Sequence, residues 1–158
     1  MKNLFLCLFL ALSFLANAQE KYDFKASFKR AIAPACLGFT SGVSGGLREA
    51  TMWRKDRFFD LFPKANRQYW DNNLSLKNKY TRPWYIPVQL TDSYHMLYAV
   101  HNIGLASASI VGTAHVSKTW KTRSLKHKAL DILIQSACTS AAYLLGSELT
   151  FGVVFKRR

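Results

Sequence analysis

Acidic residues are scarce in this sequence. Nine Asp and Glu residues stand against 22 Lys and Arg residues, which leaves a formal charge of +13 on 158 residues at pH 7. Such a shortage of negative charge favours an anionic partner, either nucleic acid or the surface of an anionic bilayer. The alternative is that the positive charges only flank membrane segments.

Cysteine is rare as well, with three in the chain. Cys7 lies inside an apolar leader described below, so Cys36 and Cys138 remain in the mature protein. Both fall in apolar segments that we expect to be helical, whereas disulfide scaffolds carry more cysteines and place them in loops. The sequence therefore argues against a disulfide framework and predicts that Cys36 and Cys138 are small buried side chains.

Familiar catalytic motifs are missing too. The sequence has no H-E-x-x-H and no paired cysteines, so no known metal motif is recognisable. It has no G-x-S-x-G, and residues 40–46 (TSGVSGG) lack the strand–turn–helix context that a serine nucleophile needs. The same glycines lie within a helical run and do not form a phosphate loop. These absences favour a non-enzymatic protein without metal or cofactor.

What is present begins with a targeting segment at residues 1–18. Lys2 gives a short positive start, residues 4–15 are apolar apart from a serine, and residues 16–18 (Ala-Asn-Ala) offer a signal-peptidase site. The pattern predicts a cleaved signal peptide and export of residues 19–158, with an uncleaved signal anchor as the alternative. Export makes nucleic acid a poor choice of partner.

Three apolar segments with few charges follow the leader. Residues 31–47 carry no charge, residues 93–117 carry none if histidine is neutral, and residues 132–155 carry only Glu148. A helix needs about 20 apolar residues to cross a bilayer, so the first segment is marginal and the other two are long enough.

The expected fold class is all-α. We expect a signal peptide and then a small bundle of about three membrane-embedded or membrane-apposed helices with one long ordered loop, forming a single helical membrane domain at 19–158. Its expected parts are a helix at 27–61, a loop at 62–90, a helix at 91–117, a basic linker at 118–128 and a helix at 129–155.

Small residues recur every four positions in the three apolar segments. The sets are Gly38, Gly42 and Gly46, then Gly104, Ala108 and Gly112, and then Ser136 and Ser140. This spacing puts each set on one helix face. In a bilayer such faces allow close helix approach, which van der Waals contact and interhelical hydrogen bonds then stabilise. A soluble helical bundle with a small-residue core is the alternative.

Polar residues within or beside these segments are the candidates for chemistry, because burying them in hydrocarbon is costly. They are Glu49, Asp92, His95 and Glu148. If these side chains converge, they could bind a divalent metal or act as general acid and base. In the alternative interpretation Asp92 caps a helix, His95 lies at the membrane interface and Glu148 pairs with an arginine.

The loop at 62–90 combines aromatic rings, cations and asparagines. Amphipathic rings favour the membrane–water boundary, and cations between them attract lipid phosphates. We therefore expect the loop to sit on an anionic leaflet, with a recognition surface for a headgroup or a protein partner as the alternative. The residues assigned to this lipid- or partner-binding loop are Asn66, Tyr69, Trp70, Asp71, Lys77, Asn78, Lys79, Tyr80 and Trp84.

Three short elements in and after this loop resemble a known pattern. They read N-x-x-[YF]-W-D at 66–71, S-x-K-N-K-Y at 75–80 and D-x-x-H at 92–95. With these elements, residues 40–100 resemble an uncharacterised family of small membrane-associated proteins from Bacteroidetes-type bacteria. The resemblance implies a membrane-associated helical protein and no particular activity.

The sequence thus favours a small membrane protein of the bacterial cell envelope, in the inner membrane, with a structural, assembly or lipid-contact role. Its expected partners are membrane lipids with anionic headgroups or another membrane protein, and not nucleic acid. Two alternatives stay open. One is a membrane-embedded enzyme or transporter-like component that uses the Glu, Asp and His site, and the other is a soluble periplasmic basic helical binding protein.

Overall fold

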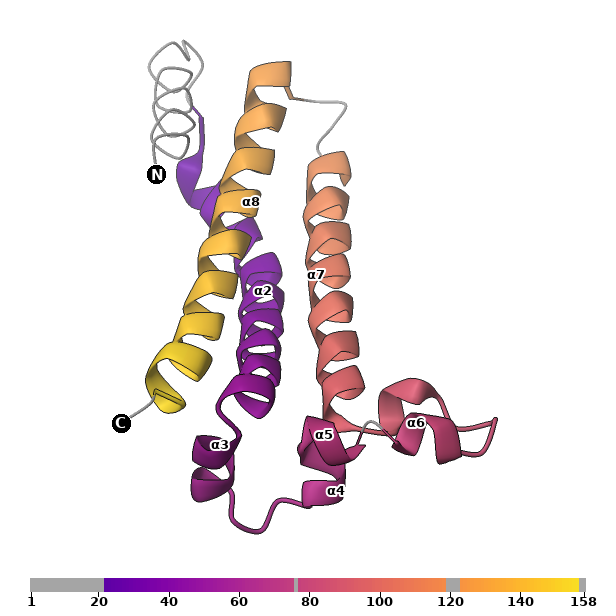
Figure 1. Cartoon of the computed structure of the whole chain (residues 1–158). Helices are drawn as coiled ribbons and strands as arrows, with labels where there is room; N and C mark the ends of the chain where they lie inside the picture. The colour runs from indigo at the N-terminus through magenta and orange to yellow at the C-terminus, as the bar shows by residue number, and fades with distance from the viewer. Residues whose placement is uncertain (1–21, 76, 119–122, 157–158) are drawn as a thin grey trace.

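The fold was obtained as a computed structural model that describes residues 22–75, 77–118 and 123–156 (Figure 1). These ranges form helices, turns and loops and contain no strand, so the predicted all-α fold class is confirmed. The predicted signal peptide at 1–18 lies outside the described residues.

Three long helices dominate the part of the chain that is described, and short helices fill the connection between the first two. The long helices are α2 (Phe24–Trp53), α7 (Ser93–Lys118) and α8 (Leu125–Ser147), which a π-helical segment η2 (Glu148–Val154) continues. The short elements are α3 (Lys55–Leu61), α4 (Arg67–Trp70), α5 (Asn72–Ser75), α6 (Asn78–Thr81) and the 3-10 turn η1 (Val88–Leu90).

Helix α2 packs along both other long helices, whereas α7 and α8 contact each other far less. Figure 1 shows the start of α2, the end of α7 and the start of α8 at one end of the bundle, and the short helices at the other. We call residues 22–30 and 123–131 the basic end, and residues 54–92 the loop end.

The single helix predicted at 27–61 is wrong, because the chain breaks it at Arg54. The backbone there has φ −132° and ψ 41°, and α3 starts at the next residue. The Arg54 guanidinium donates through Nη1 to the carbonyl oxygens of Phe151, at 2.5 Å, and Phe155, at 2.9 Å. These are carbonyls at the end of a helix, where intrahelical partners run out. A contact with residues about a hundred positions away thus stabilises the break.

The change of direction at Arg54 lets α3 bury two phenylalanines. Phe58 and Phe59 pack with Ala50 of α2 and with Phe155, the residue that follows η2. The rings of Phe58 and Phe59 meet edge-on with centroids 5.2 Å apart, and Phe58 stacks on Phe155 at 5.9 Å. This aromatic cluster holds α2, α3 and the end of η2 together at the loop end.

The other two long helices start within a few residues of their predicted bounds. Asp92 caps α7 by accepting a hydrogen bond from the His95 N–H at 2.9 Å, so the helix begins at 93 and not at 91. The third helix starts at Leu125 and not at 129, because Ser124 caps it by accepting from the His127 N–H at 3.4 Å.

The two connections between the long helices therefore differ from the prediction. The basic linker predicted at 118–128 is shorter, since α7 runs to 118 and α8 starts at 125. The loop predicted at 62–90 is not irregular throughout, because α4, α5, α6 and η1 give it several single turns.

Small polar side chains are buried between the long helices, and many large apolar side chains are exposed on them. Small polar residues such as Ser27, Ser41 and Ser44 are buried where the helices meet. Large apolar side chains on the long helices are exposed: Phe28, Ile32, Phe39, Val100, Ile103, Ile110, Ile132, Leu133, Leu144, Leu145, Leu149, Val153 and Val154. Cys36, predicted to be buried, is also exposed on α2, while Cys138 is half-buried.

Within the described residues, one continuous helix is long and apolar enough to cross a membrane by length and composition, Leu125–Val154. Of the apolar window of this helix, 22% is buried. Helices α2 and α7 do not meet the same measure, since glycine, serine, histidine and asparagine lower their hydropathy.

Candidate functional site

Glycines bring the backbones of α2 and α8 into contact. Gly38, Gly42 and Gly46 all face α8. Cβ atoms added at these positions would meet, in order, the carbonyl oxygens of Thr139 at 2.7 Å, Tyr143 in overlap and Ser147 at 2.8 Å. A side chain larger than hydrogen would push the helices apart, so the four-residue spacing creates a direct backbone contact of the kind found between membrane helices.

Serine hydroxyls link α2 to α7. Ser41 Oγ donates to the carbonyl oxygen of His101, and Ser44 Oγ donates to that of Leu97 at 3.3 Å. A Cβ added at Gly104 would lie 3.0 Å from the Cβ of Ser41, so this glycine also permits close approach. The contact between α2 and α7 therefore consists of small side chains and interhelical hydrogen bonds.

Asp131 is the centre of a buried polar cluster at the basic end. Its side chain is 1% exposed and accepts hydrogen bonds from four described residues. The donors are Tyr22 Oη at 2.5 Å, Ser27 Oγ at 2.6 Å, Arg30 Nη2 at 2.9 Å and Arg123 Nη1 at 2.6 Å. The cluster fixes the start of α2 to the start of α8.

The basic end keeps an excess of positive charge. Two guanidinium groups share the Asp131 carboxylate, and residues 22–30 and 123–131 together contain six Lys and Arg against two Asp. Burial, together with the hydrogen bond to Asp131, raises the pKa of Tyr22 from 10.0 to about 12. Tyr22 is therefore a neutral donor at physiological pH and removes none of the positive charge.

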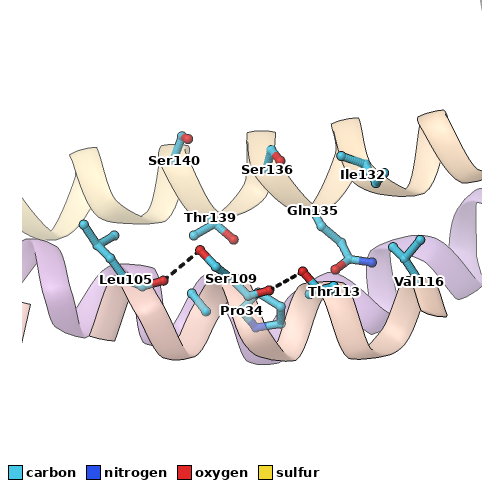
Figure 2. A pocket seen from close by; sticks show the side chains of 12 residues that line it. Pro34, Leu105, Ser109, Thr113, Val116, Ile132, Gln135, Ser136, Thr139 and Ser140 are labelled. Atoms are coloured by element: carbon cyan, nitrogen blue, oxygen red, sulfur yellow. Dashed lines mark hydrogen bonds between the residues drawn. The ribbon is translucent and has the colours of Figure 1, made fainter. Parts of the chain in front are cut away.

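A groove of about 560 Å³ lies between α7 and α8 (Figure 2). Pro34 of α2 also lines it. The walls carry mostly small side chains: Ala108, Ser109, Gly112 and Thr113 from α7, and Ser136, Thr139 and Ser140 from α8. The predicted set Gly104, Ala108 and Gly112 thus divides between the contact with α2 and this groove, and Ser136 and Ser140 line the groove.

Gln135 of α8 lies in the groove and is 4% exposed. Its side chain extends toward α7, where Gly112 makes room for it, since a Cβ at Gly112 would be 2.9 Å from Gln135 Oε1 (Figure 2). Neither Oε1 nor Nε2 of Gln135 has a hydrogen-bond partner among the described residues. A buried amide in this state costs about 1–3 kcal/mol relative to a satisfied one.

At the loop end, Asp92 and His95 form a pair. The Asp92 carboxylate is 1% exposed, accepts from Thr91 Oγ1 at 3.1 Å and lies 2.7 Å from His95 Nδ1. A carboxylate on Nδ1 orients the imidazole, as in many acid–base sites. The same carboxylate also caps α7, so the pair has a structural role as well.

The two glutamates of the predicted polar site do not join this pair. Glu49 Oε1 is 2.9 Å from Nη2 of its neighbour Arg48. Glu148 begins η2, and its Oε2 would lie 2.5 Å from a Cβ at Gly152 of the same segment. Over the described ranges, no group of three or more His, Cys, Asp or Glu residues is placed to hold a metal ion.

In the loop at 62–90, Tyr69 and Trp70 pack against the rest of the protein. Trp70 stacks on Phe58 with ring centroids 5.2 Å apart, and Tyr69 Oη donates to Met96 Sδ at 3.2 Å. Burial, followed by the negative charge of Asp92, raises the pKa of Tyr69. These two rings, which the sequence placed at the membrane surface, are half-buried against α3 and the start of α7.

Polar residues between 66 and 78 stabilise the conformation of this loop through hydrogen bonds and an ion pair. Asn66 caps α4 by accepting from the Gln68 N–H at 2.9 Å, and Asp71 pairs with Lys55 at 3.2 Å. Asn78 Nδ2 donates to the carbonyl oxygen of Thr91 at 2.9 Å, which ties α6 to the start of α7.

Several residues between 77 and 85 of the same loop are exposed. Tyr80, Trp84 and Tyr85 are 76%, 91% and 68% exposed, and Lys77 is exposed as well. The side chain of Lys79 lies outside what the structure describes. These rings, together with exposed polar residues such as Asn66, are available to a membrane or a partner.

Sequence reasoning missed the Asp131 cluster and Gln135. Asp131 and Gln135 are four residues apart in the first half of α8, so they share one face. This spacing could have indicated a polar site on one face of α8. The donors Tyr22 and Arg123 could not be assigned in advance, because they come from segments outside the regular helices.

No family model matches the chain, and no curated protein or solved structure shows significant similarity to it.

Proposed function

We propose that the protein is a small, non-enzymatic membrane protein of the bacterial envelope, with its long helices embedded in lipid and its two ends in contact with anionic headgroups. Its role is structural: it organises lipid, or another membrane protein, around a rigid helical bundle. The exposure of large apolar side chains on all three long helices is the observation that carries this proposal.

That exposure has a physical reading. In water, this many exposed large apolar side chains on the long helices would favour association or aggregation. In lipid the exposure of these side chains is not unfavourable, because acyl chains solvate Ile, Leu, Val and Phe. The helices are then held together by small-residue packing and interhelical hydrogen bonds. The glycine contact between α2 and α8 and the serine hydrogen bonds between α2 and α7 are interactions of that kind.

The lengths of the helices suit this arrangement. Helix α7 has 26 residues and the helix Leu125–Val154 has 30. At about 1.5 Å per residue they are about 39 Å and about 45 Å long. The hydrocarbon core of a bilayer is about 30 Å thick, so both helices are long enough to cross it, and Leu125–Val154 is also apolar enough by composition.

Both ends of the bundle carry groups suited to a membrane surface. The basic end has six Lys and Arg residues, and each cation near an anionic leaflet contributes about 1 kcal/mol of binding. The loop end presents the exposed rings of Tyr80, Trp84 and Tyr85, and such rings partition into the interface.

Washing of isolated membranes tests the proposal. A basic soluble protein held by charge is released by high salt, because salt screens exposed charges. We expect the full chain to stay in the membrane pellet after high salt and after alkaline carbonate. Release of most of the protein by either wash would contradict the proposal.

A matched pair of variants sharpens the test. Leu144 and Leu125 are 60% and 76% exposed on the continuous helix Leu125–Val154, but Leu144 lies inside this helix and Leu125 is its first residue, at the basic end. Leu144→Lys should cost up to about 2.5–3.5 kcal/mol of insertion, the value at a helix centre, and reduce the membrane fraction, while Leu125→Lys should not. In a water-soluble bundle both substitutions would be nearly neutral.

A further inference from the structure

We propose that the groove between α7 and α8 binds one acyl chain of an anionic glycerophospholipid, with the Gln135 amide on the ester carbonyl and the phosphate at the basic end. The inference rests on the proposed function, because the groove must open to lipid.

The groove is elongated along the helices. On α7 its lining runs from Leu105 to Val116, which is eleven steps of about 1.5 Å, or about 16 Å. An extended acyl chain is a thin occupant that can lie along this length. A second copy of the chain is the competing occupant, and the variants below distinguish the two.

The surroundings exclude the other thin occupant, an extended peptide. Inside a bilayer an extended backbone has no water to satisfy its N–H and C=O groups, so it is strongly disfavoured. An acyl chain has no such groups. Two hydroxyls of the α7 wall are already bonded within the helix, Ser109 to Leu105 O at 3.0 Å and Thr113 to Ser109 O at 2.8 Å. They present mainly carbon to the groove.

Gln135 gives the groove a buried amide without a partner, beside the hydroxyls of Ser136, Thr139 and Ser140. Its Nε2–H and Oε1 have no partner among the described residues, although the side chain is almost fully buried. An ester carbonyl can accept from Nε2 and so remove part of the cost of the unpartnered amide. An apolar chain without a carbonyl would leave that cost in place.

The order of groups along the helices matches a glycerophospholipid. Arg30 precedes Pro34 of the groove by four residues on α2, and Asp131 precedes Gln135 by four on α8. Four residues are about 6 Å along a helix, on one face. The cluster of Arg30, Arg123 and Asp131 thus lies one turn beyond Gln135, toward the basic end. A phosphate lies beyond the ester in the same direction, and this end is positively charged.

Native mass spectrometry of the full chain in detergent tests the proposal. The probes are phosphatidylglycerol and phosphatidylcholine with the same acyl chains, added to mixed micelles. We expect one tightly retained phosphatidylglycerol and weaker retention of phosphatidylcholine. Equal retention of the two lipids, or retention of neither, would overturn the proposal.

Variants locate the binding. Ser136→Leu fills the groove and should abolish retention, while Ala137→Leu adds the same side chain to the same helix away from the groove lining and should not. Ser140→Leu is a second groove-filling variant, should Ser136→Leu fail to fold. Gln135→Leu removes the hydrogen bond and should weaken retention about two- to tenfold.

The remaining outcomes separate the two proposals. Retention that is the same in Ser136→Leu, Ser140→Leu and Gln135→Leu as in the unaltered chain overturns the groove assignment alone, if the chain also resists carbonate extraction. Extraction by carbonate overturns the proposed function and the groove with it. A dimer that is lost in Ser136→Leu but kept in Ala137→Leu would mean that a second copy occupies the groove, which also contradicts the assignment.

Discussion

Gly42 of α2 lies directly against Tyr143 of α8, so closely that a Cβ at residue 42 would overlap the Tyr143 carbonyl oxygen. Backbone cannot move out of the way as a flexible side chain can. Glycine at position 42 therefore allows the backbones of α2 and α8 to touch. The contact lies inside a bundle whose outer surface exposes many apolar side chains.

Gly42→Ala should therefore destabilise the bundle, although alanine is the better helix former. Overpacking of this kind costs about 1–3 kcal/mol, more than the roughly 1 kcal/mol that alanine gains in helix propensity. Gly152→Ala is the matched control, because its Cβ would meet only the carboxylate of the exposed Glu148 side chain. Reversible unfolding in mixed detergent micelles measures both. An unchanged Gly42→Ala variant would show that the helices are not in contact there.

Asp131→Ala should lower stability by about 3–5 kcal/mol, because it leaves the guanidinium groups of Arg30 and Arg123 without their shared carboxylate. Arg123→Gln should cost less, since three donors to Asp131 remain. The exposed Asp60 serves as a control, and Asp60→Ala should change stability by less than about 0.5 kcal/mol. Equal effects of the three variants in detergent unfolding would refute the central role of Asp131.

Alkaline pH should weaken the basic end through Tyr22. Its pKa rises from 10.0 in the unfolded chain to about 12 in the folded protein, so the folded state holds the phenolic proton more tightly. The stability it contributes is complete below pH 10 and is lost as the pH rises through about 12. In an absorbance titration of phenolate, a group that ionises near pH 12 should disappear in Tyr22→Phe. A Tyr22 that titrates near 10 would contradict the hydrogen bond to Asp131.

Asp92→Ala should loosen the first turn of α7 and the loop that packs on it. The variant removes the cap on the His95 N–H and the partner of the His95 ring, with a cap alone contributing about 0.5–2 kcal/mol. Asp92→Asn should retain most of the protection, because asparagine caps as well as aspartate. Hydrogen exchange at residues 93–97 measures the difference, and equal protection in the two variants would argue against the cap.

Periodicity in the sequence predicted the helical class and the glycine faces of α2, because the spacing of residues within one helix depends on local geometry alone. It could not say which faces meet. The serines of α8 at 136 and 140 share the spacing of the glycines but face the groove, and α8 meets α2 through Thr139 and Tyr143. The rotation of a helix about its axis is set by its neighbours.

Features that depend on distant residues were beyond local reasoning. The break at Arg54 needs the carbonyls of Phe151 and Phe155, and the burial of Trp70 needs Phe58. Aromatic and basic composition alone suggested that the whole loop lies on a membrane. In the structure, Tyr69 and Trp70 pack against neighbouring helices, whereas Tyr80, Trp84 and Tyr85 are exposed.

Thiol labelling of Cys36 tests membrane embedding most directly. Cys36 is exposed on the outer surface of α2 within the uncharged run 31–47, so only the surrounding medium protects it. In intact membranes, with Cys138 replaced by serine, we expect a water-soluble maleimide to label Cys36 far more slowly than a cysteine introduced by Trp84→Cys in the exposed loop. Detergent-free labelling of Cys36 at the rate of the loop position would contradict the account, because the outer face of the bundle would then lie in water.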